Sequence, residues 1–92
     1  KGAVTSFCRA LAVELARHKI RVNSILPGWI VTDMTARATA DEKFTANVMP
    51  RIPARRWGAI DDFGGAAVWL ASDASSYYTG EQLDIDGGYT KF

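Results

Sequence analysis

The sequence predicts an α/β fold built on a parallel sheet, and three observations carry this prediction. Apolar residues recur at helical spacing over 3–17, and a β-branched-rich apolar run over 20–26 follows at once. A second helical pattern spans 60–71 and precedes a period-two strand pattern at 81–86. A helix that feeds a buried strand is half of a β-α-β unit, and parallel strands need neighbours on both sides. We therefore expect the sheet to extend beyond this chain.

The first helix is predicted from one apolar stripe, with charged residues on the opposite side. The residues of the stripe are Val4, Phe7, Cys8, Leu11, Ala12 and Leu15. Within it, Cys8 is interpreted as a small core residue, because free cysteines are usually buried. His18 closes the helix with no cluster of partners around it, so we interpret it as a surface residue rather than a ligand or base.

The run from Ile20 to Leu26 is bounded by Pro27-Gly28, as expected for a short buried strand. Asn23 and Ser24 interrupt its apolar character, and they need hydrogen-bond partners from neighbouring segments because unpaired buried polar groups are costly. The exposed backbone of the Pro27-Gly28 turn and the hydroxyl group of Thr32 follow the end of this strand. The carboxyl end of the strands is where open α/β sheets bind ligands.

Residues 33–58 are less regular and are predicted to form a lid or substrate loop. Thr39 and Glu42 fit a capping box, which predicts a short helix over 40–49 that is stopped by Pro50. A loop over 51–58 follows. The alternative interpretation of the whole segment is a solvated surface excursion.

The helix over 60–71 begins with Asp61 and Asp62, whose charge suits the positive end of a helix dipole. Gly64-Gly65 costs about 1 kcal/mol per glycine relative to alanine inside a helix. We expect close approach of another backbone to compensate, so this pair and Trp69 indicate packing against a sheet or a second subunit. Leu83 and Ile85 are expected to face inward on a half-exposed edge strand.

Composition excludes several classes of function. The 92 residues carry a net charge of +1 with both signs interspersed, which predicts neither nucleic-acid nor anionic-membrane binding. No apolar run approaches the roughly 18 residues of a membrane span, and no signal peptide is visible. The single cysteine excludes an internal disulfide, so a reducing cytoplasm is the expected location.

Four motifs in order carry a family resemblance: Val22–Gly28 with Ile30-Val31-Thr32, Arg56-Trp57-Gly58, Leu70–Asp73, and Gly80–Gly88. Over all 92 residues the chain resembles the C-terminal part of a short-chain dehydrogenase/reductase. The resemblance implies the C-terminal portion of a Rossmann-like, doubly wound parallel sheet. It also implies one domain fragment over 1–92, with the lid region at 33–58.

The resemblance further implies a function and a site. Lys1 looks like the catalytic lysine of a Tyr-x-x-x-Lys motif, where an ammonium group lowers the pKa of the phenol and also holds the nicotinamide ribose. The expected activity interconverts an alcohol and a carbonyl with NAD or NADP, in a sugar-acid or polyol dehydrogenase or a 3-oxoacyl reductase. Cofactor contacts fall on Lys1, Pro27, Gly28, Ile30 and Thr32, and substrate-lid contacts fall on Trp29, Met34 and Trp57.

Several parts of such an enzyme are missing from these 92 residues: the Gly-rich phosphate loop, the catalytic Ser and the catalytic Tyr. We therefore expect this chain to be inactive alone. The alternative is a non-catalytic structural or oligomerisation module derived from the same fold. In either case the resemblance implies a homo-oligomer, a tetramer or dimer, formed through the Ile60–Ala71 helix and the Gln82–Asp86 strand, with no metal site.

Overall fold

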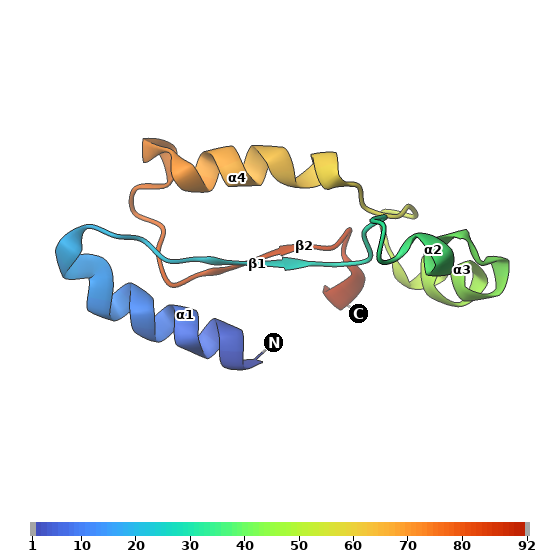
Figure 1. Cartoon of the computed structure of the whole chain (residues 1–92), viewed down its shortest axis with the longest axis horizontal. Coiled ribbons are helices and arrows are strands. Elements are labelled where there is room, and N and C mark those ends of the chain that lie inside the picture. Colours follow the sequence, from blue (N-terminus) through green and yellow to red (C-terminus); the bar gives the residue numbers. More distant parts are fainter. Residues whose placement is uncertain (1, 92) are drawn as a thin grey trace. The chain divides into compact units, whose positions relative to one another are not determined.

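The computed structural model describes residues 2–91 as a mixed α/β structure (Figure 1). Lys1, predicted to be catalytic, lies outside the described residues. The longer elements are α1 (Gly2–Leu15), β1 (Ser24–Pro27), α2 (Ala36–Ala40), α3 (Glu42–Val48), α4 (Gly64–Ala71) and β2 (Gln82–Ile85). Two compact units emerge: residues up to Leu26 with Gly65–Leu83, and Pro27–Gly64 with the residues from Asp84 onward.

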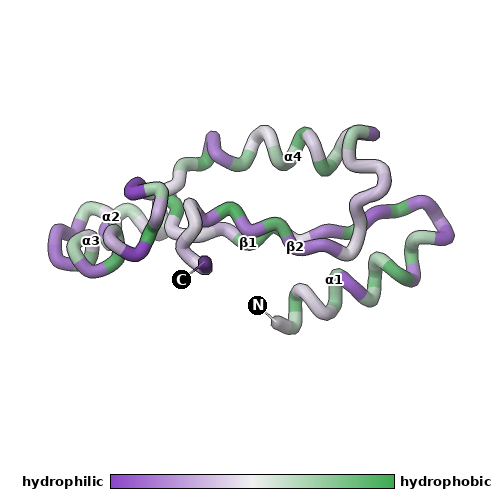
Figure 2. Tube along the Cα trace, turned by 180° about the vertical axis from the view of Figure 1, so that it is seen from behind, coloured by the Kyte–Doolittle hydropathy of each residue, from purple (hydrophilic) through white to green (hydrophobic). Residues whose placement is uncertain are grey.

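β1 and β2 pair as a two-stranded sheet, and both figures of the whole chain draw them side by side (Figures 1 and 2). The Ser24 N–H donates to Glu81 O at 2.9 Å, and the Gly28 N–H donates to Ile85 O at 2.9 Å. The register advances in the same direction on both strands, so the pair is parallel, as predicted. The ladder begins at Ser24, later than the predicted start at Ile20.

The residues before β1 hold the turn before β2 through side chains. Asn23 donates from Nδ2 to Tyr78 O at 3.0 Å, and its Oδ1 accepts from the Glu81 N–H at 3.1 Å. The Ser24 hydroxyl donates to Glu81 O at 3.4 Å. The predicted need of these two polar residues for partners is confirmed. Because Asn23 pairs with the turn through its amide group, this stretch is fixed without belonging to the ladder.

Arg21 fastens the end of α4 within the first unit. Its Nη1 donates to Ser75 Oγ at 2.8 Å, and its Nη2 donates to the carbonyl oxygens of Leu70 at 2.9 Å and Ser72 at 3.3 Å. Ser75 is 2% exposed. The last carbonyls of a helix have no partner inside the helix. Arg21 satisfies them from a distant part of the sequence.

Two helix predictions need correction. Asp41, not Thr39, caps α3, because its side chain accepts from the Phe44 N–H at 3.4 Å; Thr39 lies inside α2, which the sequence pattern did not predict. The predicted helix over 60–71 begins as a 3₁₀ turn over Ile60–Phe63 and becomes α-helical only at Gly64. The Asp62 side chain accepts from the Ala59 N–H and so caps this first turn.

The described residues make no close approach at Gly64-Gly65, and packing of this pair against a second subunit stays a prediction. A Cβ built on either glycine has no atom of the described residues within 4 Å, apart from its chain neighbours and the backbone of its own helix. The hydropathy colours run mostly pale to green along this helix (Figure 2), and Val68 is 71% exposed. Cys8, expected in the core, is only half-buried, whereas His18 is exposed as predicted.

No helix among residues 2–91 combines the length and the apolar character that a membrane crossing requires.

Candidate functional site

A groove of about 370 Å³ lies at the carboxyl end of β1. Its lining consists of Pro27, Gly28, Ile30, Thr32, Thr35, Ile60 and Phe63. All four described residues that were predicted to contact a cofactor are therefore brought together on one surface. Thr35, Ile60 and Phe63 complete the lining and were not predicted as site residues. The groove is mainly apolar, with two threonines and the turn backbone as its polar groups, a composition typical of small-molecule sites.

Gly28 is required by packing inside the molecule. A Cβ at this position would lie 2.5 Å from Asp86 Cβ and 2.6 Å from Asp86 Cα. The sequence predicts Gly28 as a cofactor contact, which stays a prediction. The structure adds a reason of its own for this glycine, which is the close approach of Asp86 after β2.

The peptide N–H and C=O of Ile30 point away from Gly58, the residue with which Ile30 pairs. The Gly58 N–H donates to Trp29 O at 2.8 Å, and the Val31 N–H donates to Gly58 O at 2.9 Å, which forms an isolated parallel bridge around Ile30. In such a bridge the N–H and C=O of the central residue point to the opposite side. The Ile30 C=O accepts from the Thr35 hydroxyl. The hydrogen bonds among residues 2–91 give the Ile30 N–H no partner.

Thr32 and Thr35 form a tight polar pair beside this amide. The Thr32 N–H donates to Thr35 Oγ1 at 2.9 Å, and the Thr35 N–H donates to Thr32 Oγ1 at 3.3 Å. The two hydroxyl oxygens are 3.3 Å apart. Thr35 has one hydroxyl proton and directs it to the Ile30 carbonyl, so Thr32 is the donor between the hydroxyls. A lone pair of Thr32 Oγ1 remains for a ligand.

The predicted lid residues lie elsewhere. Trp29 and Trp57 belong to an aromatic cluster with Phe44 and Tyr89: Trp29 contacts Phe44 edge-on at 5.2 Å between ring centroids, and Phe44 stacks with Trp57 at 6.1 Å. Neither tryptophan lines the groove. Met34 is 94% exposed. In this structure the two tryptophans pack α3 onto the segment after β1, and their substrate contacts stay a prediction.

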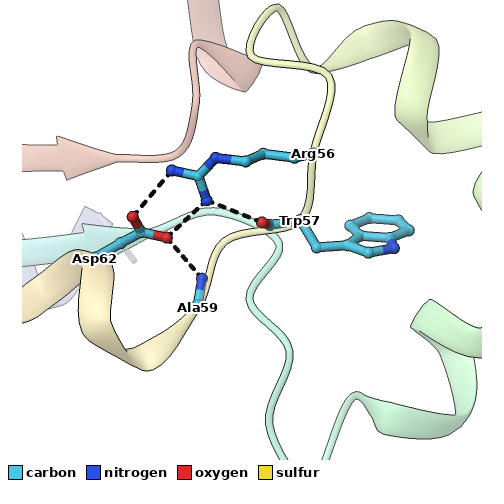
Figure 3. A network of polar contacts seen from close by, with 4 residues as sticks. All are labelled: Arg56, Trp57, Ala59 and Asp62. Atoms are coloured by element: carbon cyan, nitrogen blue, oxygen red, sulfur yellow. Dashed lines mark hydrogen bonds and ion pairs between the residues drawn. The ribbon is translucent and has the colours of Figure 1, made fainter.

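An exposed ion pair closes the turn that leads into residues 60–63 (Figure 3). Arg56 binds Asp62 with two parallel hydrogen bonds of 2.8 and 2.9 Å and donates to Trp57 O at 3.1 Å. The Ala59 N–H donates to Asp62 Oδ2 at 2.7 Å. The hydrogen bond from Arg56, followed by that from Ala59, lowers the pKa of Asp62 to about 2. Figure 3 shows the Trp57 ring pointing away from this pair.

Asp86 performs a similar task at the end of β2. It accepts from the Thr90 hydroxyl at 2.6 Å, from the Gly88 N–H at 2.9 Å and from the Thr90 N–H at 3.0 Å. The Thr90 hydroxyl is the largest cause that lowers the pKa of this carboxyl. Among the described residues, no three His, Cys, Asp or Glu side chains gather as they would to hold a metal ion.

Thr35 is the site residue that sequence reasoning missed. The available signal was a second threonine three residues after Thr32; its N-cap position before α2 is known only from the structure. The pattern does not reveal that its hydroxyl turns back to the Ile30 carbonyl, because that contact depends on the path of the loop.

Known proteins resemble this chain over nearly its whole length. A family model described as enoyl-(acyl carrier protein) reductase matches residues 1–90. The chain is 44% identical over 90 residues to gluconate 5-dehydrogenase of Gluconobacter oxydans (strain 621H), covering 98% of this chain and 35% of that protein. It is 50% identical over 88 residues to 5-keto-D-gluconate 5-reductase of Escherichia coli (strain K12), covering 96% of this chain and 35% of that protein.

A solved structure is also similar to this chain over its whole length. The crystal structure of a gluconate 5-dehydrogenase from Burkholderia cenocepacia J2315, in complex with NADP and tartrate, superposes with a TM-score of 0.94. The identity is 37%, and the match covers 100% of this chain and 36% of that one. The chain thus spans about a third of the length of the relatives it matches. With a family model that matches nearly every residue and a fold that superposes closely, the chain belongs to the short-chain dehydrogenases/reductases.

Proposed function

We propose that this chain is the C-terminal third of a pyridine-nucleotide-dependent oxidoreductase that interconverts the alcohol and carbonyl forms of a sugar acid. The observation that carries the proposal is the pair of polar groups on the groove. The Ile30 N–H has no partner within residues 2–91, and Thr32, which lines the same groove, has a lone pair on Oγ1 to offer. The relatives that act on gluconate and 5-ketogluconate support the substrate class.

The groove fits the nicotinamide end of NAD or NADP. The Ile30 N–H is a donor for the carboxamide oxygen, and Thr32 Oγ1 is an acceptor for the carboxamide N–H. Pro27 and Phe63 supply apolar surface for the ring. Once bound, the nicotinamide supplies the hydride chemistry, and the residues of this chain fix which face of its ring meets the substrate.

Lys1 completes the proposal from outside the described residues. Its ammonium group would lower the pKa of a tyrosine four residues upstream in the longer protein, so that the phenol serves as acid or base near neutral pH. It would also hold the ribose hydroxyls of the cofactor. Since the catalytic tyrosine, the catalytic serine and the Gly-rich phosphate loop are not among these 92 residues, the 92-residue chain alone should not turn over substrate.

The test uses the longer protein with Thr32→Val. Loss of one hydroxyl contact should weaken cofactor binding by roughly two- to tenfold and raise the KM for NAD or NADP accordingly. Steady-state kinetics with gluconate, with a polyol and with a 3-oxoacyl thioester would measure this and rank the substrate classes. Unchanged cofactor constants would contradict the assigned contact. Carbonyl reduction by the purified 92-residue chain would contradict its inactivity.

The second candidate, a non-catalytic assembly module, is favoured by one observation. α4 exposes Val68 at 71% and Trp69 at 37%, and Gly64 and Gly65 have open space above them in the described structure. We propose that this helix and β2 form subunit contacts in a homo-oligomer located in the cytoplasm. Subunit contact and catalysis are compatible. The assembly role would be the only function left if the longer protein turned over none of the substrates and bound no cofactor.

A further inference from the structure

The hydroxyl group of Thr35 hydrogen-bonds to the loop before α2 rather than to α2. Thr35 occupies the N-cap position of α2, yet its side chain makes no hydrogen bond to the amides of that helix. A threonine at an N-cap normally accepts from the N–H two or three residues later. Here the same oxygen donates to the Ile30 carbonyl and accepts from the Thr32 N–H at 2.9 Å. The Thr35 side chain thus hydrogen-bonds to the loop before α2 and does not cap α2 itself.

This arrangement connects the two groups that face the groove. Ile30 and Thr32 are separated by Val31 alone, and Thr35 bonds the peptide C=O of one and the peptide N–H of the other. Its oxygen also lies 3.3 Å from Thr32 Oγ1. The orientation of the free Ile30 N–H and the position of the Thr32 hydroxyl are therefore both set by one side chain, which itself lines the groove.

We propose that Thr35 is a positioning residue for nicotinamide recognition, and the inference rests on the function proposed above. It aims the Ile30 amide and the Thr32 hydroxyl at the carboxamide group of NAD or NADP, and it does not touch the reacting atoms. Without its hydroxyl, the Ile30 carbonyl and the Thr32 N–H lose their partner, and the loop between them is free to turn. The longer protein should then bind the dinucleotide but read its carboxamide group poorly.

The test compares two dinucleotides in the longer protein: the natural NAD or NADP, and its 3-acetylpyridine analogue, which keeps the carbonyl oxygen but lacks the amide nitrogen. Dissociation constants are measured by fluorescence titration of the wild type and of variants checked by circular dichroism. The wild type should prefer the natural dinucleotide by roughly fivefold, the value of one neutral hydrogen bond. In Thr35→Val this preference should fall below about twofold.

Two variants separate positioning from plain structural support. Thr35→Ser keeps the hydroxyl and should retain the preference. Thr39→Val is the matched control: its hydroxyl donates to Thr35 O at 3.1 Å and Ala36 O at 3.3 Å, in the same short helix, but does not line the groove. It should leave the preference at the wild-type value. If Thr35→Val does not fold, Thr35→Ala removes the hydroxyl without placing a methyl group against the Ile30 carbonyl.

The outcomes distinguish the two proposals. Equal weakening of both dinucleotides by Thr35→Val, or no change in either, overturns the positioning role while the proposed function stands. A wild-type protein that binds neither dinucleotide and oxidises no alcohol overturns the proposed function, and this inference with it.

Discussion

Gly28→Ala should be among the most destabilising substitutions of this chain, because the new methyl group has nowhere to go. Its carbon would lie 2.5 Å from Asp86 Cβ and 2.6 Å from Asp86 Cα, whereas carbon atoms pack at about 3.5–4.0 Å. The two strand ends must separate by about 1 Å, which strains the hydrogen bond from the Gly28 N–H to Ile85 O. Overpacking costs about 1–3 kcal/mol and a lost ladder bond about 1 kcal/mol more, so we expect about 3 kcal/mol in all.

Thermal and urea unfolding of the longer protein would measure this loss. A loss of about 3 kcal/mol corresponds to a Tm roughly 6–12 °C lower, with the urea m-value unchanged. Gly2→Ala is the matched control, since outside its own helix nothing in the described structure lies within 4 Å of its new carbon. It should be neutral or stabilising by up to about 1 kcal/mol. A Tm for Gly28→Ala within 1–2 °C (about 0.5 kcal/mol) of the wild type would refute the reasoning.

Three further predictions concern charge and assembly. Arg56 helps hold the pKa of Asp62 at about 2, below its ordinary 3.8. The Tm of the wild type should therefore exceed that of Asp62→Asn by its full amount above about pH 4, and the difference should disappear as the pH falls toward 2. A pH-independent difference would contradict this. Arg21→Gln removes charged donors from the end of α4 and should cost about 2 kcal/mol in urea unfolding, whereas a cost near zero would make these bonds incidental. Val68→Glu, at a side chain 71% exposed, should dissociate the proposed oligomer in sedimentation velocity, and Met34→Glu, at one 94% exposed, should not.

The fold class and the location of the groove were predictable from the sequence because both depend on local patterns. The helical spacing up to Leu15, the apolar run before Pro27 and the alternation around Leu83 each describe one element. Pro27-Gly28 marks the carboxyl end of a strand, and a ligand site was expected there because open α/β sheets bind ligands at that end. The same local reasoning misplaced the cap of α3, because Thr39 and Asp41 both stand near its start and only the loop path selects Asp41.

Sequence patterns alone therefore determined that this protein has helices and parallel strands, and which turn carries the polar groups of the groove; the dehydrogenase type came from the resemblance of its motifs to a family. Only the tertiary structure decided the roles of the individual residues. Gly28 is needed for the approach of Asp86, Trp29 and Trp57 enter an aromatic cluster, and Thr35 turns back to Ile30. The physical reason is distance along the chain: propensity and periodicity act between near neighbours, whereas these contacts depend on how separate segments meet in space.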